Sequence, residues 1–419
     1  MYFKSERILV WSILFLMLIF IVRDILGVNI NPYAITLLLS LIACSLSYKD
    51  LIAYSCFLLP LSCGIQSFIW VVVAGCIIYR KGKISNRALS LFLLFVILEI
   101  IDQSRTIIYD INIKNTLFYF TSLFLVLYLV HDEYSNADYA KNVRYFIYGS
   151  CFLLFALFTR IILHFGIEEV LTGVLRYKLD DITLSGDYVF FTNANNLGLY
   201  SATCFSILLY LGQINLKISR FLYVVLITVV VIGGMLTFSR TWLLLSLGAL
   251  LMYLLVRKKN AYFLLLLLII AVVFTFALSS DYFMSIVEVF ETRMTADDIK
   301  DGAGRIDLFS LYNDFFKNHS EYWITGTGAM YYLQICQQPN SIHNMIQQTY
   351  ICYGVLGLIG VGLLFSGILS KNRIYITTML QYAPLVCYVL FIQTVQFFNP
   401  IFCMYPLVAC VYCLKVKQD

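Results

Sequence analysis

The sequence predicts an all-α fold, a polytopic bundle of membrane helices, and two observations support this prediction. Hydrophobic residues make up 61% of the 419 residues and charged residues only 13%, and the mean hydropathy is +0.84. Apolar runs long enough to cross a hydrocarbon layer about 30 Å thick recur from one end of the chain to the other. One soluble core could not bury so much apolar surface, so we expect a single integral membrane domain over residues 1–419.

About 12–14 transmembrane helices are expected. The first run follows Lys4 and Arg7 without a small-residue cleavage site after it, which indicates a retained span rather than a removed signal peptide. The run from Leu51 to Tyr79 is too long for one span, and Pro60 and Gly64 divide it into two short helices. The expected spans are residues 8–22, 33–47, 51–62, 65–79, 88–101, 116–131, 143–165, 191–212, 219–237, 240–256, 261–279, 345–369, 374–392 and 400–414.

The distribution of charge predicts the orientation of these spans. With a cytoplasmic N-terminus, the inner loops hold 18 of the 29 basic and 6 of the 24 acidic residues, giving net charges of +12 inside and −7 outside. Basic residues favour the cytoplasmic side of a membrane. Both termini are then inside, and residues 280–342 form one large extracytoplasmic loop. Within it we expect helices over 281–295 and 304–317, the second from its helix-like apolar spacing, and a chain break at Gly326-Thr327-Gly328.

Three residues on the predicted outer side are candidates for chemistry. His343 lies two residues before the span 345–369, and an imidazole with an ordinary pKa of about 6.5 exchanges protons at physiological pH. Arg240 lies at a span end, where an arginine close to hydrocarbon is costly. Arg305 begins the second loop helix. The alternatives are a histidine that only anchors a helix end, an arginine that snorkels to lipid phosphates, and a surface arginine paired with Asp301 or Asp307.

Together these three residues suggest a site for an anionic lipid headgroup. Two guanidinium groups can hold a pyrophosphate through paired hydrogen bonds, and a histidine can act as the base for a hydroxyl nucleophile. Neither the twelve cysteines nor the four histidines show metal-ligand spacing, so we expect no metal and no cofactor. Nothing in the composition points to nucleic acid.

Two further charged groups remain ambiguous in the sequence. The first comprises Glu99, Asp102 and Arg105, near the outer end of the fifth span. It is either a structural ion-pair cluster, which we favour, or part of a site for an acceptor sugar. The second, Arg160, His164 and Arg176, flanks another outer loop and allows the same two interpretations.

Several short motifs around the large loop carry a resemblance to a known family. They are Thr237-Phe238-Ser239-Arg240-Thr241, the helix start Gly304-Arg305, Trp323-Ile324-Thr325-Gly326-Thr327-Gly328, His343-Asn344 followed by Gly354 and Gly357, and the asparagine-rich stretch Phe191-Thr192-Asn193-Ala194-Asn195-Asn196-Leu197-Gly198. In order and spacing they resemble the O-antigen ligase/polymerase superfamily, bacterial enzymes that move lipid-pyrophosphate-linked glycans at the outer face of the inner membrane. The chain departs from the family pattern in lacking a proline before Gly326 and in having Thr241 and Trp242 after Arg240.

The resemblance implies a GT-C-like glycosyltransferase in the bacterial inner membrane, with its active site on the periplasmic side. Arg240 and Arg305 would hold the pyrophosphate and His343 would act as the base. Asn344, Asn193, Asn195 and Asn196 are further candidates for substrate binding. The implied partners are an undecaprenyl-pyrophosphate-linked glycan as donor and acceptor, membrane lipid and a chain-length regulator protein.

We expect a polymerase of lipid-linked repeat units, making O-antigen or capsular polysaccharide. One alternative is a ligase that transfers the glycan to lipid A core. Another is a flippase for lipid-linked oligosaccharide, but a transporter favours charges at mid-membrane, and here they gather at the outer ends of the spans.

Overall fold

The computed structural model describes residues 2–81, 83–105, 113–167, 190, 192–213, 218–257, 305–338, 340–369, 379–398 and 401–416. Within these ranges it contains α-helices and short 3-10 helices and no strand, which confirms the all-α prediction. The α-helices are α1 (Tyr2–Asp24), α2 (Pro32–Ser45), α3 (Tyr48–Leu58), α4 (Phe68–Lys81), α5 (Asn86–Arg105), α6 (Ile113–His131), α7 (Asn136–Phe165), α10 (Ala194–Gln213), α11 (Arg220–Met235), α12 (Arg240–Arg257), α16 (Arg305–Asn318), α17 (Tyr332–Ile335), α18 (Met345–Leu369), α19 (Met379–Phe391) and α20 (Tyr405–Lys415).

These helices correspond closely to the predicted spans. Each predicted span except 261–279 coincides with a described helix, and α18 has the predicted bounds. The span 261–279 and the loop helix 281–295 lie outside the described residues, whereas the second loop helix is present as α16. In the described part of the chain, α7 and α18 are long and apolar enough to cross a membrane, and five shorter helices are also apolar.

The predicted interruption between the third and fourth spans is confirmed. Pro60–Gly64 form a 3-10 helix, η1, between α3 and α4. Gly64 lies against Phe190, whose ring would be only 2.3 Å from a β-carbon at this position. A glycine is therefore required here to let two distant segments meet.

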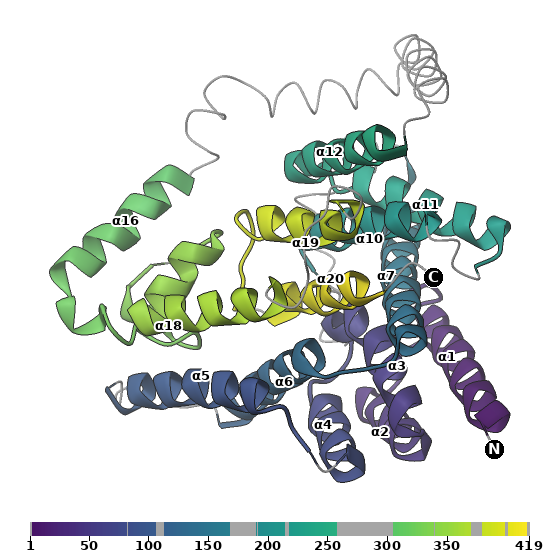
Figure 1. The fold of residues 1–419 in the computed structure, drawn as a ribbon, viewed down its shortest axis with the longest axis horizontal. Helices are drawn as coiled ribbons and strands as arrows, with labels where there is room; N and C mark the ends of the chain where they lie inside the picture. The colour runs from purple at the N-terminus through teal and green to yellow at the C-terminus, as the bar shows by residue number, and fades with distance from the viewer. Residues whose placement is uncertain are drawn as a thin grey trace, which may run out of the picture.

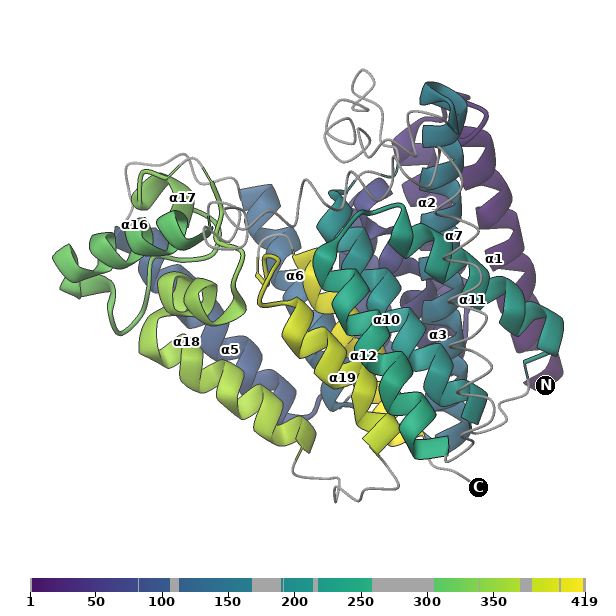
Figure 2. The ribbon, with the colours of Figure 1, turned by 90° about the horizontal axis from the view of Figure 1, so that it is seen from above.

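The helix ends predicted to be cytoplasmic gather at one end of the bundle. Arg80, at the end of α4, donates to the carbonyls of Ala43 and Cys44 near the end of α2. Lys415, in the last turn of α20, donates to the carbonyls of Val130 and Asp132 at the end of α6. Figure 2 shows both chain termini toward this end and α16 and α17 at the opposite end.

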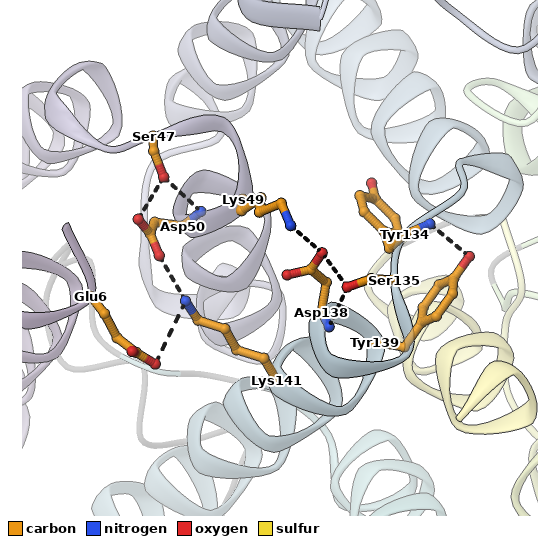
Figure 3. Close-up of polar contacts among 9 residues, drawn as sticks. All are labelled: Glu6, Ser47, Lys49, Asp50, Tyr134, Ser135, Asp138, Tyr139 and Lys141. Carbon is orange, nitrogen blue, oxygen red and sulfur yellow. Dashed lines mark hydrogen bonds and ion pairs between the residues drawn. The ribbon is translucent and has the colours of Figure 1, made fainter. Parts of the chain in front are cut away.

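Two reciprocal ion pairs join α3 to α7 at this end of the bundle (Figure 3). Lys49 of α3 binds Asp138 of α7 at 2.8 Å, and Lys141 of α7 binds Asp50 of α3 at 2.7 Å. Ser47 and Ser135 cap the two helices through the backbone N–H groups of the same two aspartates. Partial burial opposes ionisation of Asp138, but the hydrogen bonds from Lys49 and Ser135 outweigh it and hold its pKa below the usual value.

A second polar cluster joins segments at the opposite end. Arg23 of α1 donates to the carbonyl of Gly64 at 2.6 Å, and Asp24 accepts from the backbone N–H of Phe190 at 2.8 Å. Arg160 of α7 donates to the carbonyl of Phe190 at 2.7 Å and lies 3.4 Å from Asp24. Arg160, which the sequence left ambiguous, therefore ties α7 to α1 and to the segment before α10. Its predicted neighbour Arg176 lies outside the described residues.

The helices form two groups around the centre of the molecule (Figure 1). The helices α10, α11, α12 and α19 pack together on one side, and α5 lies beside α18 on the other. Helices α7 and α20 pack against each other, and α7 also packs against α3 and α11, whereas α20 packs against α6 and α19. Helices α3 and α7 approach closely at Gly149, where a β-carbon would be 2.1 Å from the carbonyl oxygen of Phe57.

Candidate active site

Arg240 lies at the start of α12, directly after a tight buried turn. Thr237 donates its hydroxyl to the carbonyl of Gly234 at 2.6 Å and accepts from the backbone N–H of Ser239. Phe238 adopts a left-handed conformation with φ of 47°, which is uncommon for a side chain of this size. The chain thus reverses within a few residues and presents Arg240 as the first, half-buried residue of α12.

The start of α12 is suited to an anion. Ser239 accepts hydrogen bonds from the backbone N–H groups of Trp242 and Leu243, through its hydroxyl and carbonyl oxygens respectively. The first turn contains no acidic residue. The positive end of the helix dipole and the Arg240 guanidinium therefore reinforce each other.

Neighbouring helices hold this turn in place. Trp242 donates its indole N–H to the Ser201 hydroxyl of α10 at 2.8 Å. A β-carbon at Gly198 of α10 would be 3.2 Å from the β-carbon of Ser239 and 3.1 Å from the ring of Phe391. The turn before Arg240 therefore packs where α10 meets the end of α19.

His343 lies in the segment before α18, and its neighbours fix the backbone on both sides. Asn344 caps α18, since its side-chain oxygen accepts from the backbone N–H of Gln347 at 3.0 Å. The N–H of Met345 donates to the carbonyl of Ile392 at the end of α19, and Ser341 accepts from the side chain of Gln396. His343 itself is half-buried.

Arg240 and His343 are therefore brought to the same helix end. The turn before Arg240 packs beside Phe391, and the segment after His343 bonds to Ile392, the next residue. Gln348 strengthens this junction by accepting from the backbone N–H groups of Phe397 and Phe398. Two segments about 100 residues apart thus both lie beside the C-terminal end of α19.

Arg305 is the first residue of α16, and α16 packs against the segment that carries His343. Tyr312 of α16 donates to the carbonyl of Asn340 at 2.7 Å, and Gln347 donates its amide to the carbonyl of Phe309 at 3.1 Å. The side chain of Arg305 lies outside the described part of the structure. Its helix is placed beside the His343 segment, as the sequence motifs suggest.

The asparagine-rich segment forms the start of α10. The side-chain oxygen of Asn193 accepts from the backbone N–H of Asn196 at 2.9 Å, which caps the helix. Asn196 is buried, donates to the Thr192 hydroxyl at 3.0 Å and accepts from the Cys403 thiol at 3.2 Å. Asn195 is half-buried in the first helical turn. Asn193 and Asn196 thus fix the start of α10, the helix that packs against the turn before Arg240.

The structure reveals an interlock that the sequence did not predict. Helix α18 is broken at Gly354, which has φ 62° and ψ −157°. The segment before α17 supplies the missing backbone partners: Val355 donates to Trp323, while Thr327 and Gly328 donate to the carbonyls of Ile351 and Cys352. The only sequence signal was the glycine pair in each of the two motifs, and it did not show that they bind each other.

Glu99 and Arg105 also bind this loop segment. Glu99 is fully buried and accepts from the backbone N–H groups of Ala329 and Met330 at 2.9 and 3.2 Å. Arg105 donates to the hydroxyl of Thr325 at 2.9 Å. Glu99 and Arg105 therefore have a structural role. They hold the loop segment and do not join helices of the bundle to one another as an ion-pair cluster would. In the described residues, no three His, Cys, Asp or Glu side chains group as they would around a metal ion.

Comparison with known families supports the resemblance. Residues 222–362 match the model of the O-antigen ligase family, and this region contains Arg240, Arg305, His343 and both segments that interlock at Gly354. The chain has no match among curated proteins or among solved structures. The match over residues 222–362 supports a relationship to the O-antigen ligase/polymerase superfamily and a membrane function of the ligase/polymerase type.

Proposed function

We propose that this protein polymerises undecaprenyl-pyrophosphate-linked oligosaccharide repeat units at the outer face of the bacterial inner membrane. The proposal is supported by the positions of the Arg240 turn and the His343 segment, which both lie beside the end of α19, and by the match of this region to the O-antigen ligase family. A donor pyrophosphate beside Arg240 would also face the positive end of α12.

The proposed reaction is a single displacement with inversion. The acceptor hydroxyl oxygen attacks the anomeric carbon of the donor sugar while the bond from that carbon to the pyrophosphate oxygen breaks. His343 takes the hydroxyl proton, and undecaprenyl pyrophosphate leaves with the electron pair. Arg240 and Arg305 stabilise the charge that develops on the leaving group. In this mechanism the two arginines supply the positive charge, so no divalent metal is needed.

A ligase is the second candidate, and the description of the matched family favours it. The two activities share the donor and differ in the acceptor, which is another lipid-linked repeat for a polymerase and lipid A core for a ligase. We favour the polymerase because the chain is rich in tyrosine and phenylalanine and its motifs are loose, as in divergent polymerases of surface-polysaccharide synthesis.

Deletion of the gene, followed by gel analysis of the surface glycan, separates the two candidates. A single repeat unit on the lipid A core after deletion is the expected result, because ligation continues while polymerisation is lost. Long chains that remain on undecaprenyl pyrophosphate would identify a ligase instead. Complementation with the intact gene should restore the original chain lengths.

A further inference from the structure

Two adjoining cavities lie beside η1, at the end of the bundle opposite the chain termini. The first, the polar cavity, has a volume of about 500 Å³ and is lined by η1, α4, α6, α20 and the residues Thr192, Met330, Ile401 and Phe402. The second, the apolar groove, has a volume of about 580 Å³ and lies between α2, α4 and α6. Ser67, Asn115 and Phe118 line both, so the two spaces adjoin each other.

The polar cavity has the chemistry of a saccharide site. Trp70 and Tyr405, 2% and 3% exposed, form part of its wall with their ring centres 5.9 Å apart, and an aromatic wall can contact the C–H groups of a sugar. The hydroxyls of Ser62 and Ser122 lie beside them and interact with Tyr405. Aromatic surface with a few placed polar groups is typical of a small-molecule site, and hydroxyls can both donate to and accept from sugar hydroxyls.

The apolar groove has the chemistry of a site for a lipid chain. Tyr33, Leu37 and Phe68 line it and are 69%, 62% and 49% exposed, so it opens on the outer surface of the bundle. Lys114 lies at its rim, 5.9 Å from the ring of Phe118. An ammonium group in the apolar groove, beside the ring of Phe118 that also lines the polar cavity, is suitably placed for a phosphate that joins a lipid to a sugar.

The polar cavity shares walls with the candidate active site. Thr192 lines the cavity and accepts from Asn196, which lies two residues before Gly198, the residue that packs closely on Ser239. On another side Met330 lines the cavity and donates its backbone N–H to Glu99. The first turn of α10 therefore connects the wall of the cavity to the Arg240 turn.

We propose that the polar cavity and the apolar groove together bind the acceptor, a polyprenyl-linked saccharide. Its sugars occupy the polar cavity, its phosphate lies by Lys114, and its lipid chain follows the groove between α2, α4 and α6. The donor pyrophosphate occupies a separate place at Arg240. This inference rests on the proposed function in that a polymerase needs two lipid-linked substrates at once.

Photo-crosslinking tests the site independently of turnover. The full-length protein with His343→Ala, placed in lipid nanodiscs, receives a photoreactive benzoylphenylalanine at position 115 or, as a matched control, at position 117. Both residues are exposed on the first turns of α6, but only Asn115 lines the cavities. The probe is radiolabelled lipid-linked repeat unit extracted from the deletion strain.

We expect at least fivefold more crosslinked lipid-linked saccharide from position 115 than from position 117. Excess unlabelled lipid-linked saccharide should remove the signal, whereas undecaprenyl phosphate without sugar should compete poorly. Equal crosslinking at both positions, or equal competition by the sugar-free lipid, would overturn the assignment of a saccharide site.

A kinetic experiment then separates this site from the proposed function. Asn115→Trp narrows both cavities and should raise the KM for a lipid-linked acceptor at least tenfold in otherwise active protein, whereas Leu117→Trp should not. An unchanged KM in Asn115→Trp contradicts the site. The deletion strain could accumulate long chains on undecaprenyl although position 115 crosslinks the probe. In that case the cavities bind a lipid-linked saccharide, but the protein is not a polymerase.

Discussion

At the scale of single residues, the candidate chemistry depends on where Arg240 is held rather than on its charge alone. The buried turn at Thr237–Ser239 and the absence of an acid in the first turn of α12 direct a positive field outward from this helix end. The sequence identified Arg240 because an arginine at a span end is costly. It could not show the left-handed Phe238 or the packing of Gly198 on Ser239, which depend on distant segments.

Arg240→Ala and Arg305→Ala should each reduce polymerisation by roughly 100- to 1000-fold, the usual loss when one group that stabilises a developing negative charge is removed. Arg→Lys should restore activity only in part, because a point charge replaces a planar group that binds phosphate through two hydrogen bonds. Chain lengths on gels, normalised to the amount of folded protein, provide the measurement.

The matched control for this pair is Arg220→Ala. Arg220 is also the first residue of a helix, α11, but it is exposed and lies on the predicted cytoplasmic side. It should retain the wild-type chain lengths. Wild-type chain lengths in Arg240→Ala would show that Arg240 only contacts lipid phosphates and does not bind the donor pyrophosphate.

His343→Ala should suppress the chemical step while the donor lipid still binds. A histidine that acts as the base works only when neutral, so the activity of the unmodified protein should fall as the pH decreases through the range where imidazoles titrate, about 6 to 7. The assay uses purified protein in lipid, with lipid-linked repeat unit as the sole substrate and a chelator present.

Two results of that assay would contradict the mechanism. One is full turnover by His343→Ala, which would leave the histidine without a catalytic role. The other is a strict requirement for an added divalent metal. Asn344 should be less sensitive than His343, because the structure shows it capping α18, and Asn344→Ser should keep most of that cap.

At the scale of secondary-structure elements, α18 shows what the sequence predicted and what it could not. The helix bounds followed from an apolar run of the right length, and the predicted break at Gly326–Gly328 is confirmed. The break within α18 was not predicted, because an isolated glycine in a helical run is usually tolerated. It exists because a segment about 30 residues earlier bonds to the backbone groups that the break releases.

Gly354→Ala should therefore destabilise the protein strongly. The conformation at Gly354, φ 62° and ψ −157°, is one that essentially only glycine adopts, and it costs another residue about 1–3 kcal/mol. The new β-carbon would also be 2.3 Å from the carbonyl carbon of Ile324. Both effects act on backbone that cannot move without breaking the interlock. The midpoint of thermal unfolding in detergent, followed by size-exclusion chromatography, should fall by several degrees.

Gly362→Ala is the matched control, since Gly362 lies two turns further along α18 with no neighbouring atom within 4 Å of a new β-carbon. It should leave the unfolding midpoint unchanged or raise it slightly, because alanine is the better helix former by about 1 kcal/mol. Equal behaviour of the two variants would show that the break at Gly354 is not a structural requirement.

At the scale of the whole molecule, the bundle has two chemically distinct ends. One gathers the helix ends that hold Lys49, Arg80, Lys141 and Lys415. The other gathers η1, Arg160 and the loop bound by Glu99. Hydropathy and charge alone predicted which helix ends would share a face, because each span reverses the direction of the chain. They could not predict which helices are neighbours, since apolar faces carry little information about their partners.

The orientation of these two ends in the membrane is a further prediction. The positive-inside rule assigns the lysine- and arginine-rich end to the cytoplasm, and α16, on the opposite end in Figure 2, to the outer side. A reporter fused after Lys259 should therefore report a cytoplasmic location, and one fused after Asn318, the last residue of α16, an outer location. The donor pyrophosphate faces outward in the proposed reaction, so this result is also required by the mechanism. If both reporters are found in the same compartment, neither the orientation nor a reaction at the outer face can be correct.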